Sequence, residues 1–91
     1  MKVVWLGTAR DDRRRIFGYL AERNPAAAAR LVEALILAAD GLASFPWRGR
    51  RGLAPGTHEL VAASPYLLVY EVDEATEVVS ILRVWHSAQN R

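Results

Sequence analysis

Arg83 and His86 are the residues whose types and spacing are best suited to chemistry. They lie three positions apart at the end of an apolar run, with Trp85 beside the histidine. An imidazole in that position could serve as a general acid or base near neutral pH. The alternative is a strand-end histidine bonded to backbone and solvent, and the residues alone favour that alternative. His58 is a weaker candidate still.

Other catalytic and metal-binding patterns are missing from the sequence. Neither histidine has a partner at the spacing of a metal site, and there is no cysteine to supply a thiolate. No arrangement of serine, histidine and aspartate supports a nucleophile, and no glycine-rich phosphate loop opens a helix. Glu59 and Glu71 are far apart along the chain and are more typical of edge charges than of a catalytic pair. We therefore expect no cofactor and no metal.

Arginine supplies eleven of the twelve basic residues, and most of these fall in two clusters. The first cluster is Arg10, Arg13, Arg14 and Arg15, and the second is Arg48, Arg50 and Arg51 beside Trp47. Guanidinium groups suit bidentate contacts with phosphate or carboxylate, and aromatic rings among cations are typical of nucleic-acid binding. A solvated surface is an equally good interpretation of the first cluster, and short arginine-rich loops are common.

The composition is that of a globular protein. The 91 residues allow one domain, 1–91, with 52% hydrophobic residues and a net charge of +2. The absence of cysteine is compatible with a reducing compartment, and we expect the cytoplasm. No apolar run approaches the ~20 residues of a membrane span, and the apolar start is too short for a signal peptide. No contact with a membrane is expected.

The element expected before the first arginine cluster is a short strand over 2–6. A helix should follow over 9–23, because its apolar residues recur at helical intervals. Thr8 is the expected N-cap. Asp11 and Asp12 should then lie in the first turn, where acidic residues suit the helix dipole.

A second helix is expected to begin at Pro25, with Asn24 as its N-cap, and to end near Ser44. Its apolar stripe consists of Ala28, Leu31, Val32, Leu35, Ala39 and Leu42. The junction between the two helices is so short that they should fold back as an antiparallel hairpin.

The second half of the chain reads as strands. A loop over 46–56 precedes strands expected over 57–63, 66–72 and 77–85, with a tight turn over 73–76. Three strands joined by short turns make an antiparallel meander. The helical hairpin should pack on one face of this small sheet, which gives an α+β fold with an N-terminal strand.

The sheet face away from the helices is expected to lack cover. Outward residues such as Leu67, Val69 and Ile81 should therefore remain in partial contact with water. An exposed apolar sheet face often marks a partner site.

Six segments, in chain order, resemble the ParE/RelE superfamily of bacterial toxins. They are Val4-Trp5-Leu6 with Ala9-Arg10-Asp11-Asp12, Ile16 to Ala28 with its Asn24-Pro25-Ala26-Ala27-Ala28 phrase, Phe45-Pro46 with Arg48-Gly49-Arg50, Gly56-Thr57-His58-Glu59-Leu60-Val61, Tyr66-Leu67-Leu68-Val69-Tyr70-Glu71-Val72, and Ile81-Leu82-Arg83-Val84-Trp85-His86-Ser87-Ala88-Gln89. The resemblance spans nearly the whole chain.

The resemblance implies the toxin of a type II toxin–antitoxin system, with the fold deduced above. It also implies a cognate antitoxin partner of the ParD type, which binds DNA. ParE-type toxins are associated with poisoning DNA gyrase, whereas RelE-type toxins cleave messenger RNA on the ribosome. The alanine-rich phrase and the long second helix favour the ParE branch, which binds its target and is not a hydrolase. A ribosome-dependent endonuclease and a fold that has lost toxicity remain the alternatives.

Two departures from the family pattern weaken the nuclease interpretation. The arginine of the family's "G-T-R-E-L-V" phrase is His58 here, and the arginine of its "YRIVYEV" phrase is Leu67. RelE-type cleavage relies on basic side chains across the sheet to stabilise the phosphate in transfer. Arg83 and His86 are the catalytic candidates that remain for a nuclease.

Contacts with the antitoxin or the target are expected on the open sheet face, the arginine loop and the C-terminal end. The residues predicted for these contacts are Trp47, Arg48, Arg50, Arg51, Leu67, Val69, Arg83, His86 and Arg91. Nucleic acid is expected to be bound only through the antitoxin.

Overall fold

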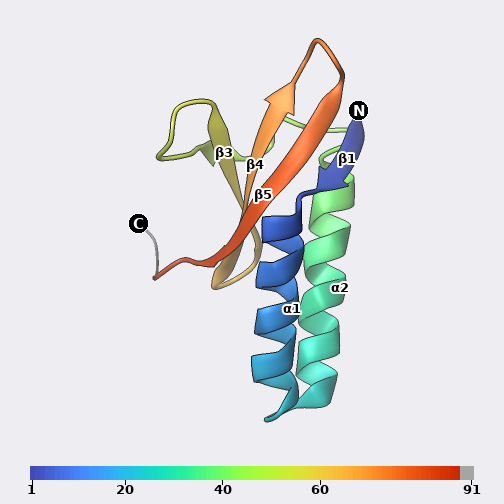
Figure 1. The fold of residues 1–91 in the computed structure, drawn as a ribbon, viewed down its shortest axis with the longest axis vertical. Coiled ribbons are helices and arrows are strands. Elements are labelled where there is room, and N and C mark those ends of the chain that lie inside the picture. The colour runs from blue at the N-terminus through green and yellow to red at the C-terminus, as the bar shows by residue number, and fades with distance from the viewer. Residues whose placement is uncertain (89–91) are drawn as a thin grey trace.

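Two helices pack against one curved sheet in this protein (Figure 1). The computed structural model describes residues 1–88. The elements are β1 (Lys2–Trp5), α1 (Gly7–Ala21), α2 (Pro25–Gly41), β2 (Arg50–Arg51), β3 (Thr57–Ala63), β4 (Tyr66–Asp73) and β5 (Val78–His86). The sheet order is β1-β5-β4-β3-β2, with β1 parallel to β5 and the other neighbours antiparallel. The predicted α+β fold is confirmed.

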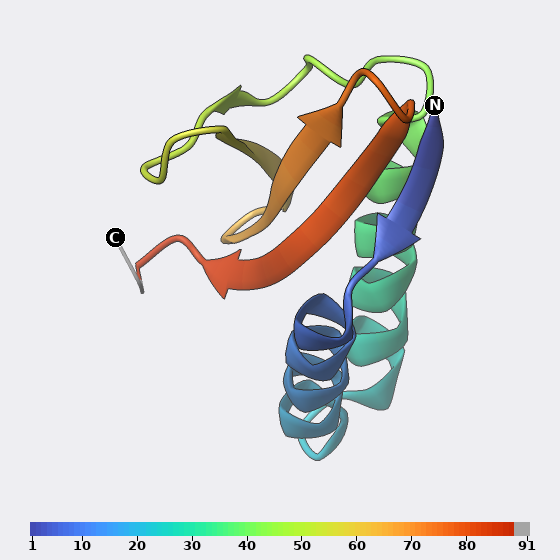
Figure 2. The same cartoon turned by 45° about the horizontal axis from the view of Figure 1, so that its top comes forward.

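The helices form the expected hairpin and extend past one end of the sheet (Figure 2). Asn24 caps α2 by accepting a hydrogen bond from the Ala27 amide at 3.1 Å, and Pro25 begins the helix, as predicted. Within the predicted stripe of α2, Ala28, Leu35, Ala39 and Leu42 are fully buried. The helix itself ends at Gly41, and its last carbonyls are taken up by a following turn.

The predicted start of α1 is wrong. The helix begins at Gly7, so Leu6 stands in the N-cap position without a side-chain cap, and no acidic residue lies in the first turn. Thr8 and Asp12 instead turn their oxygens toward β5, where they meet backbone groups that lack a strand partner. Tertiary hydrogen bonds therefore replace the local capping that the sequence suggested.

The core lies between the helical hairpin and one sheet face. Its fully buried members are Ala9, Leu35, Ala39, Leu42, Leu68, Tyr70, Val79, Ile81 and Val84. Side chains of a strand alternate between faces, so Leu68 and Tyr70 point to the helices while Leu67 and Val69 point away. The hairpin thus covers the predicted face.

The prediction that Leu67, Val69 and Ile81 are partly exposed is wrong, since their exposed fractions are 1%, 5% and 0%. Leu67 lies between Val61 and Trp85 in the register, and these neighbours on both adjacent strands, above all the larger Trp85, shield it from water. Val69 is likewise flanked by the long side chains of β3 and β5 opposite it. A central strand position therefore buries these side chains without a second layer.

Ile81 faces the helices because the register between β4 and β5 shifts. Val69 pairs with Arg83 and Tyr70 pairs with Ile81, so Leu82 is an extra residue in β5. Such a bulge resets the alternation of side chains along the strand. If side chains are assumed to alternate without interruption along β5, Ile81 is placed on the face away from the helices, which is incorrect.

Candidate functional site

Asp12 and Arg83 form a bidentate ion pair between α1 and β5. The Nε atom of Arg83 donates to Oδ2 of Asp12 at 2.8 Å, and Nη2 donates to Oδ1 at 3.0 Å. Arg15 donates to the same carboxylate at 3.0 Å. The side chain of Asp12 is 2% exposed and that of Arg83 is 40% exposed. Arg83 is therefore already engaged by a carboxylate within the protein, which limits its availability for a phosphate.

The Asp12 carboxylate also completes the edge of β5. Strand β1 ends at Trp5, so the following backbone of β5 has no strand neighbour on that side. Thr8 Oγ1 donates to the Leu82 carbonyl at 2.7 Å, and the Val84 amide donates to Asp12 Oδ2 at 2.9 Å. Two side chains of α1 thus satisfy backbone groups that would otherwise be unpaired.

This environment keeps Asp12 ionised. Burial raises the pKa of Asp12, but hydrogen bonds from Arg83, the Val84 amide and Arg15 outweigh it and bring the pKa below its usual value of 3.8. The hydrogen bond to Asp12 raises the pKa of Arg83 in turn. The pair can hold two elements together and orient a cation, but it supplies no group that exchanges a proton near neutral pH.

His86 lies in a groove of about 540 Å³ beside α1. The groove is lined by Arg15, Ile16, Tyr19, Tyr66, Val84, Trp85 and His86. The rings of His86 and Tyr66 meet edge to face with centroids 5.4 Å apart. Nδ1 of His86 accepts the Ala88 amide at 3.1 Å. His86 is thus bonded to the backbone, which is the alternative that the sequence favoured. It shares its groove with the phenols of Tyr19 and Tyr66 and the guanidinium of Arg15.

Tyr70 fastens the arginine-rich loop to the sheet. Its hydroxyl donates to the Pro46 carbonyl at 2.8 Å and accepts the Gly49 amide at 2.9 Å. Burial raises the pKa of Tyr70, so the hydroxyl keeps its proton for Pro46. A Cβ at position 49 would lie 2.6 Å from the Glu59 carbonyl oxygen, so this close approach requires glycine. The loop is held in place at both Pro46 and Gly49.

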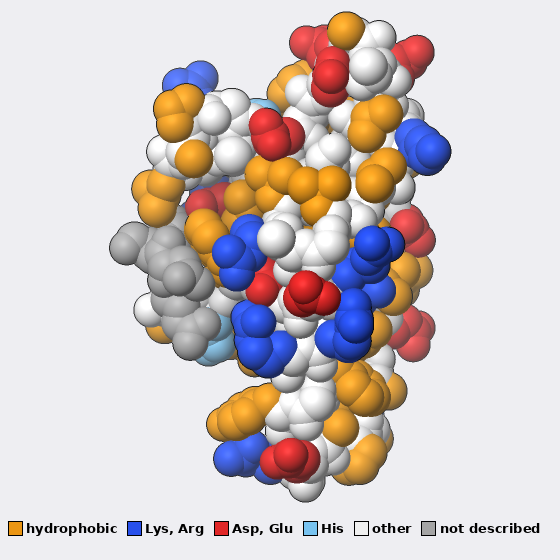
Figure 3. Space-filling view, in the orientation of Figure 1, with side chains coloured by type: hydrophobic (Ala, Val, Ile, Leu, Met, Phe, Trp, Pro, Cys, Tyr) orange, Lys and Arg blue, Asp and Glu red, His pale blue; other side chains and the backbone are white. Residues whose placement is uncertain are grey.

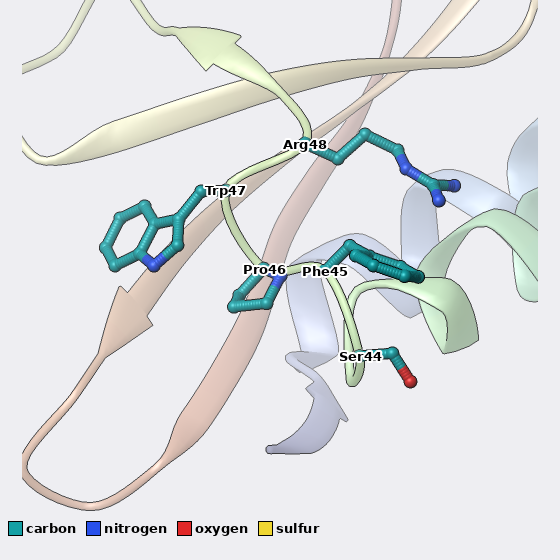
Figure 4. A pocket seen from close by; sticks show the side chains of 5 residues that line it. All are labelled: Ser44, Phe45, Pro46, Trp47 and Arg48. Atoms are coloured by element: carbon teal, nitrogen blue, oxygen red, sulfur yellow. The ribbon is translucent and has the colours of Figure 1, made fainter.

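The fastened loop presents aromatic rings around a shallow pocket of about 430 Å³ (Figure 4). Phe45 and Trp47 are 61% and 53% exposed. The Arg48 guanidinium lies 5.1 Å from the centroid of the Phe45 ring, while Trp47 points to the opposite side and packs edge-on against His58 at 5.2 Å. We call Phe45, Trp47 and Arg48 the aromatic loop surface.

Arg50 has a structural partner. Its Nε and Nη2 atoms donate to Glu59 Oε1 at 3.3 and 3.2 Å, and the Glu59 side chain is 2% exposed. A buried carboxylate is costly without such a cation. Arg51 follows Arg50 in β2 and pairs through its backbone with His58. Within residues 1–88, no carboxylate forms an ion pair with Arg48 or Arg51.

The predicted contact residues fall into two groups. Trp47, Arg48, Arg50 and Arg51 come together on the loop that meets β4 at Tyr70, whereas Arg83 and His86 lie toward the Tyr66 end of that strand. Leu67 and Val69, which were also predicted as contacts, have buried side chains in this structure. Arg91 lies outside the described residues.

Sequence reasoning missed the groups that position these side chains. Asp12 was assigned to a helix dipole and Tyr70 to an ordinary strand, yet each anchors a candidate residue. Tyr19 and Tyr66 share the groove of His86, which no pattern in the sequence indicates. All four residues act through contacts with residues far away in the sequence, which local patterns do not report.

The described part of the chain offers few other sites. Among residues 1–88, no three His, Cys, Asp or Glu side chains gather where they could hold a metal ion. In the same residues no helix is long and apolar enough to cross a lipid bilayer.

The chain belongs to the class of small α+β proteins that pack a helical hairpin on a five-stranded sheet. A family model for the ParE toxin of the type II toxin–antitoxin system parDE matches residues 3–91. Toxin RelE2 of Caulobacter vibrioides is 42% identical over 89 residues, which cover 97% of each chain. The chain belongs to the ParE toxin family within the ParE/RelE superfamily.

Solved structures share this fold. A chain of the chromosomal ParDE toxin–antitoxin system from P. aeruginosa is 21% identical, with a TM-score of 0.82 and coverage of 94% of this chain and 95% of that chain. A chain of the toxin–antitoxin complex RelBE2 from Mycobacterium tuberculosis is 28% identical, with a TM-score of 0.71 and coverage of 93% and 95%. The family match and the curated relative make the protein a toxin of the type II class.

Proposed function

We propose that this toxin acts by binding, in the manner of the ParE branch, and that its target is DNA gyrase in the cytoplasm. The observation that carries the proposal is the Asp12–Arg83 ion pair. A messenger RNA endonuclease needs free cations over the scissile phosphate. Here Arg83 is bound to a buried carboxylate, and Leu67, which stands where the family phrase has an arginine, is a buried apolar side chain. This arrangement supports a toxin that occupies its target without cleaving it.

The aromatic loop surface is the contact we assign to the target. Interface hot spots are enriched in aromatic rings and arginine, and a fixed loop loses little entropy on binding. Tyr70 fixes the loop, while Phe45 and Trp47 remain more than half exposed. A DNA-binding antitoxin of the ParD type would neutralise the toxin.

The test is inhibition of purified gyrase in a supercoiling assay, together with growth after induction. We expect the wild-type toxin to inhibit supercoiling and to stop chromosome replication while transcripts stay intact. Phe45→Ala with Trp47→Ala should lower the inhibition at least about ten-fold, as loss of two hot-spot rings implies. Leu37→Ala, which removes another exposed apolar side chain from α2, is the matched control. Full gyrase activity in the presence of folded toxin would contradict the proposal.

A messenger RNA endonuclease is the second candidate, because the groove at His86 also contains Arg15, Tyr19 and Tyr66. Phenols, an imidazole and a guanidinium are groups that can move a proton and stabilise a phosphate. If this candidate is right, induced cells should show codon-linked cuts in ribosome-bound transcripts. His86→Ala should abolish those cuts while the toxin stays folded.

A further inference from the structure

The first half of α1 carries a basic surface that the aromatic loop surface does not include. Its members are Arg10, Arg13, Arg14, Arg15 and, from β5, Arg83, and we call them the α1 arginine patch. Figure 3 shows basic side chains gathered over α1 around a smaller acidic group. Asp11 and Asp12 are the two acidic residues of α1, so five positive charges against two negative charges leave three in excess.

Tertiary contacts assemble this patch. The Asp12 carboxylate accepts one hydrogen bond from Arg15, at 3.0 Å, and two from Arg83, at 2.8 and 3.0 Å. Arg15 remains 68% exposed and Arg83 40% exposed despite this contact. The carboxylate therefore gathers two cations at the surface, although it neutralises only one of their charges.

The remaining arginines are accessible to a partner. Arg14 is 75% exposed and its partner Asp11 is 70% exposed, and such surface ion pairs exchange readily with other charges. Arg10 is exposed, and no other residue of 1–88 holds its guanidinium in an ion pair or hydrogen bond. Four residues of helix rise about 6 Å, so Arg10 and Arg14 can reach neighbouring positions of one charged chain.

We propose that the α1 arginine patch binds the phosphate backbone of double-stranded DNA, independently of base sequence. The sign of the charge and the use of arginine fit phosphate oxygens. The centre of a protein–protein interface is usually depleted in charge. Here the exposed apolar side chains, Leu6 and Phe17, lie one helical turn before Arg10 and one turn after Arg14, at the two ends of the patch. The patch is therefore cationic at its centre.

Single-stranded nucleic acid fits the patch less well than a duplex. Binding of single strands needs exposed aromatic rings on which bases can stack. The ring of Trp5 beside the patch is already covered by the Arg13 guanidinium, 4.4 Å from its centroid, and Phe17, which is 40% exposed, offers one stacking position at the end of the patch. A protein can bind a DNA duplex through its outward-facing phosphates alone, without contacting a base.

This inference revises the expectation that nucleic acid is bound only through the antitoxin. It goes beyond the proposed action on gyrase and does not depend on it. A toxin that binds DNA but leaves gyrase active would contradict the proposed function alone, and a gyrase inhibitor that ignores DNA would contradict this inference alone.

The experiment measures fluorescence anisotropy of a labelled duplex of about 30 base pairs with purified toxin between roughly 20 and 150 mM NaCl. Arg10→Ala with Arg14→Ala removes two charges from the patch. The matched control, Arg48→Ala with Arg51→Ala, removes two charges from the other arginine cluster. All four positions allow truncation without opening the core, and circular dichroism verifies the fold of each variant.

We expect the α1 variant to bind DNA about ten-fold more weakly at low salt and its salt slope to fall by about two. The control should keep its slope. Equal losses in both variants would show a response to net charge alone and would overturn the proposal, as would an unchanged α1 variant.

Two further probes complete the test. A single strand of the same sequence should bind more weakly than the duplex, and tighter binding of the single strand would refute the assignment to duplex DNA. Poly-L-glutamate of matched charge stands for an acidic protein partner. If the α1 variant loses more affinity for polyglutamate than for DNA, the patch is a protein contact and the proposal is wrong.

Discussion

The carboxylate of Asp12 and the guanidinium of Arg83 are separated by 71 positions in the sequence and meet at 2.8 Å in the structure. The pair joins α1 to β5, and the same carboxylate accepts the Val84 amide at the edge of the sheet. It also limits what Arg83 can do, because the Nε and Nη2 atoms that would clamp a substrate phosphate at two points already donate to the carboxylate, and only the other donors of this 40% exposed side chain are left for the α1 arginine patch. The energetic weight of this pair is open to direct measurement.

A double-mutant cycle on Asp12→Ala and Arg83→Ala should give a coupling energy of about 1–3 kcal/mol, since one partner is almost fully buried. The neighbouring pair of Asp11 and Arg14 joins the same residue types at 3.1 Å but is exposed on both sides, so its coupling should be about 0–0.5 kcal/mol. Urea unfolding of the variants measures both. Equal coupling in the two cycles would contradict the assigned role of burial.

The ion pair of Asp12 should make the free energy of unfolding depend on pH in the acidic range. The pKa of Asp12 is lowered in the folded protein, so the unfolded chain binds the proton more readily. The contribution is therefore present above the usual pKa of 3.8 and is lost as pH falls through the lower folded value. The difference in unfolding free energy between wild type and Asp12→Asn should be largest at neutral pH and shrink below about pH 4. Asp11→Asn is the control and should show little change.

Gly49→Ala should destabilise the protein by about 1–3 kcal/mol, because the new Cβ would meet the Glu59 carbonyl oxygen at 2.6 Å and push the loop off the sheet. Gly18→Ala is the matched control in α1, where nothing lies within 4 Å of the new Cβ. Alanine there should stabilise the helix by about 0.5–1 kcal/mol. Thermal unfolding distinguishes the two, and a neutral Gly49→Ala would show that the loop is not tightly seated.

Tyr70→Phe should release the aromatic loop surface while leaving the sheet in place. The change removes one hydroxyl and leaves the Pro46 carbonyl and the Gly49 amide without their partner. We expect a loss of about 1–3 kcal/mol in stability and faster amide exchange at residue 49. Inhibition of the target should weaken more than the melting temperature alone explains. Unchanged exchange at residue 49 would mean that other contacts hold the loop.

The sequence alone was enough to predict the helical hairpin and the antiparallel meander. Asn24 and Pro25 mark the start of α2 through hydrogen bonds within a few residues, and the strand over Thr57–Ala63 follows from its residue types. These local patterns belong to the segments that resemble the ParE/RelE superfamily.

Only the tertiary structure showed how the candidate residues are used. The bulge at Leu82 puts Ile81 on the helix side of the sheet, and neighbouring strands bury Leu67 and Val69. Asp12, which lies on α1 and far away in the sequence, forms an ion pair with Arg83. These outcomes depend on strand register and on partners far away in the chain. The local sequence pattern indicates where candidate side chains occur. Burial and ion pairs with residues far away in the chain determine which of these side chains remain free to bind a partner.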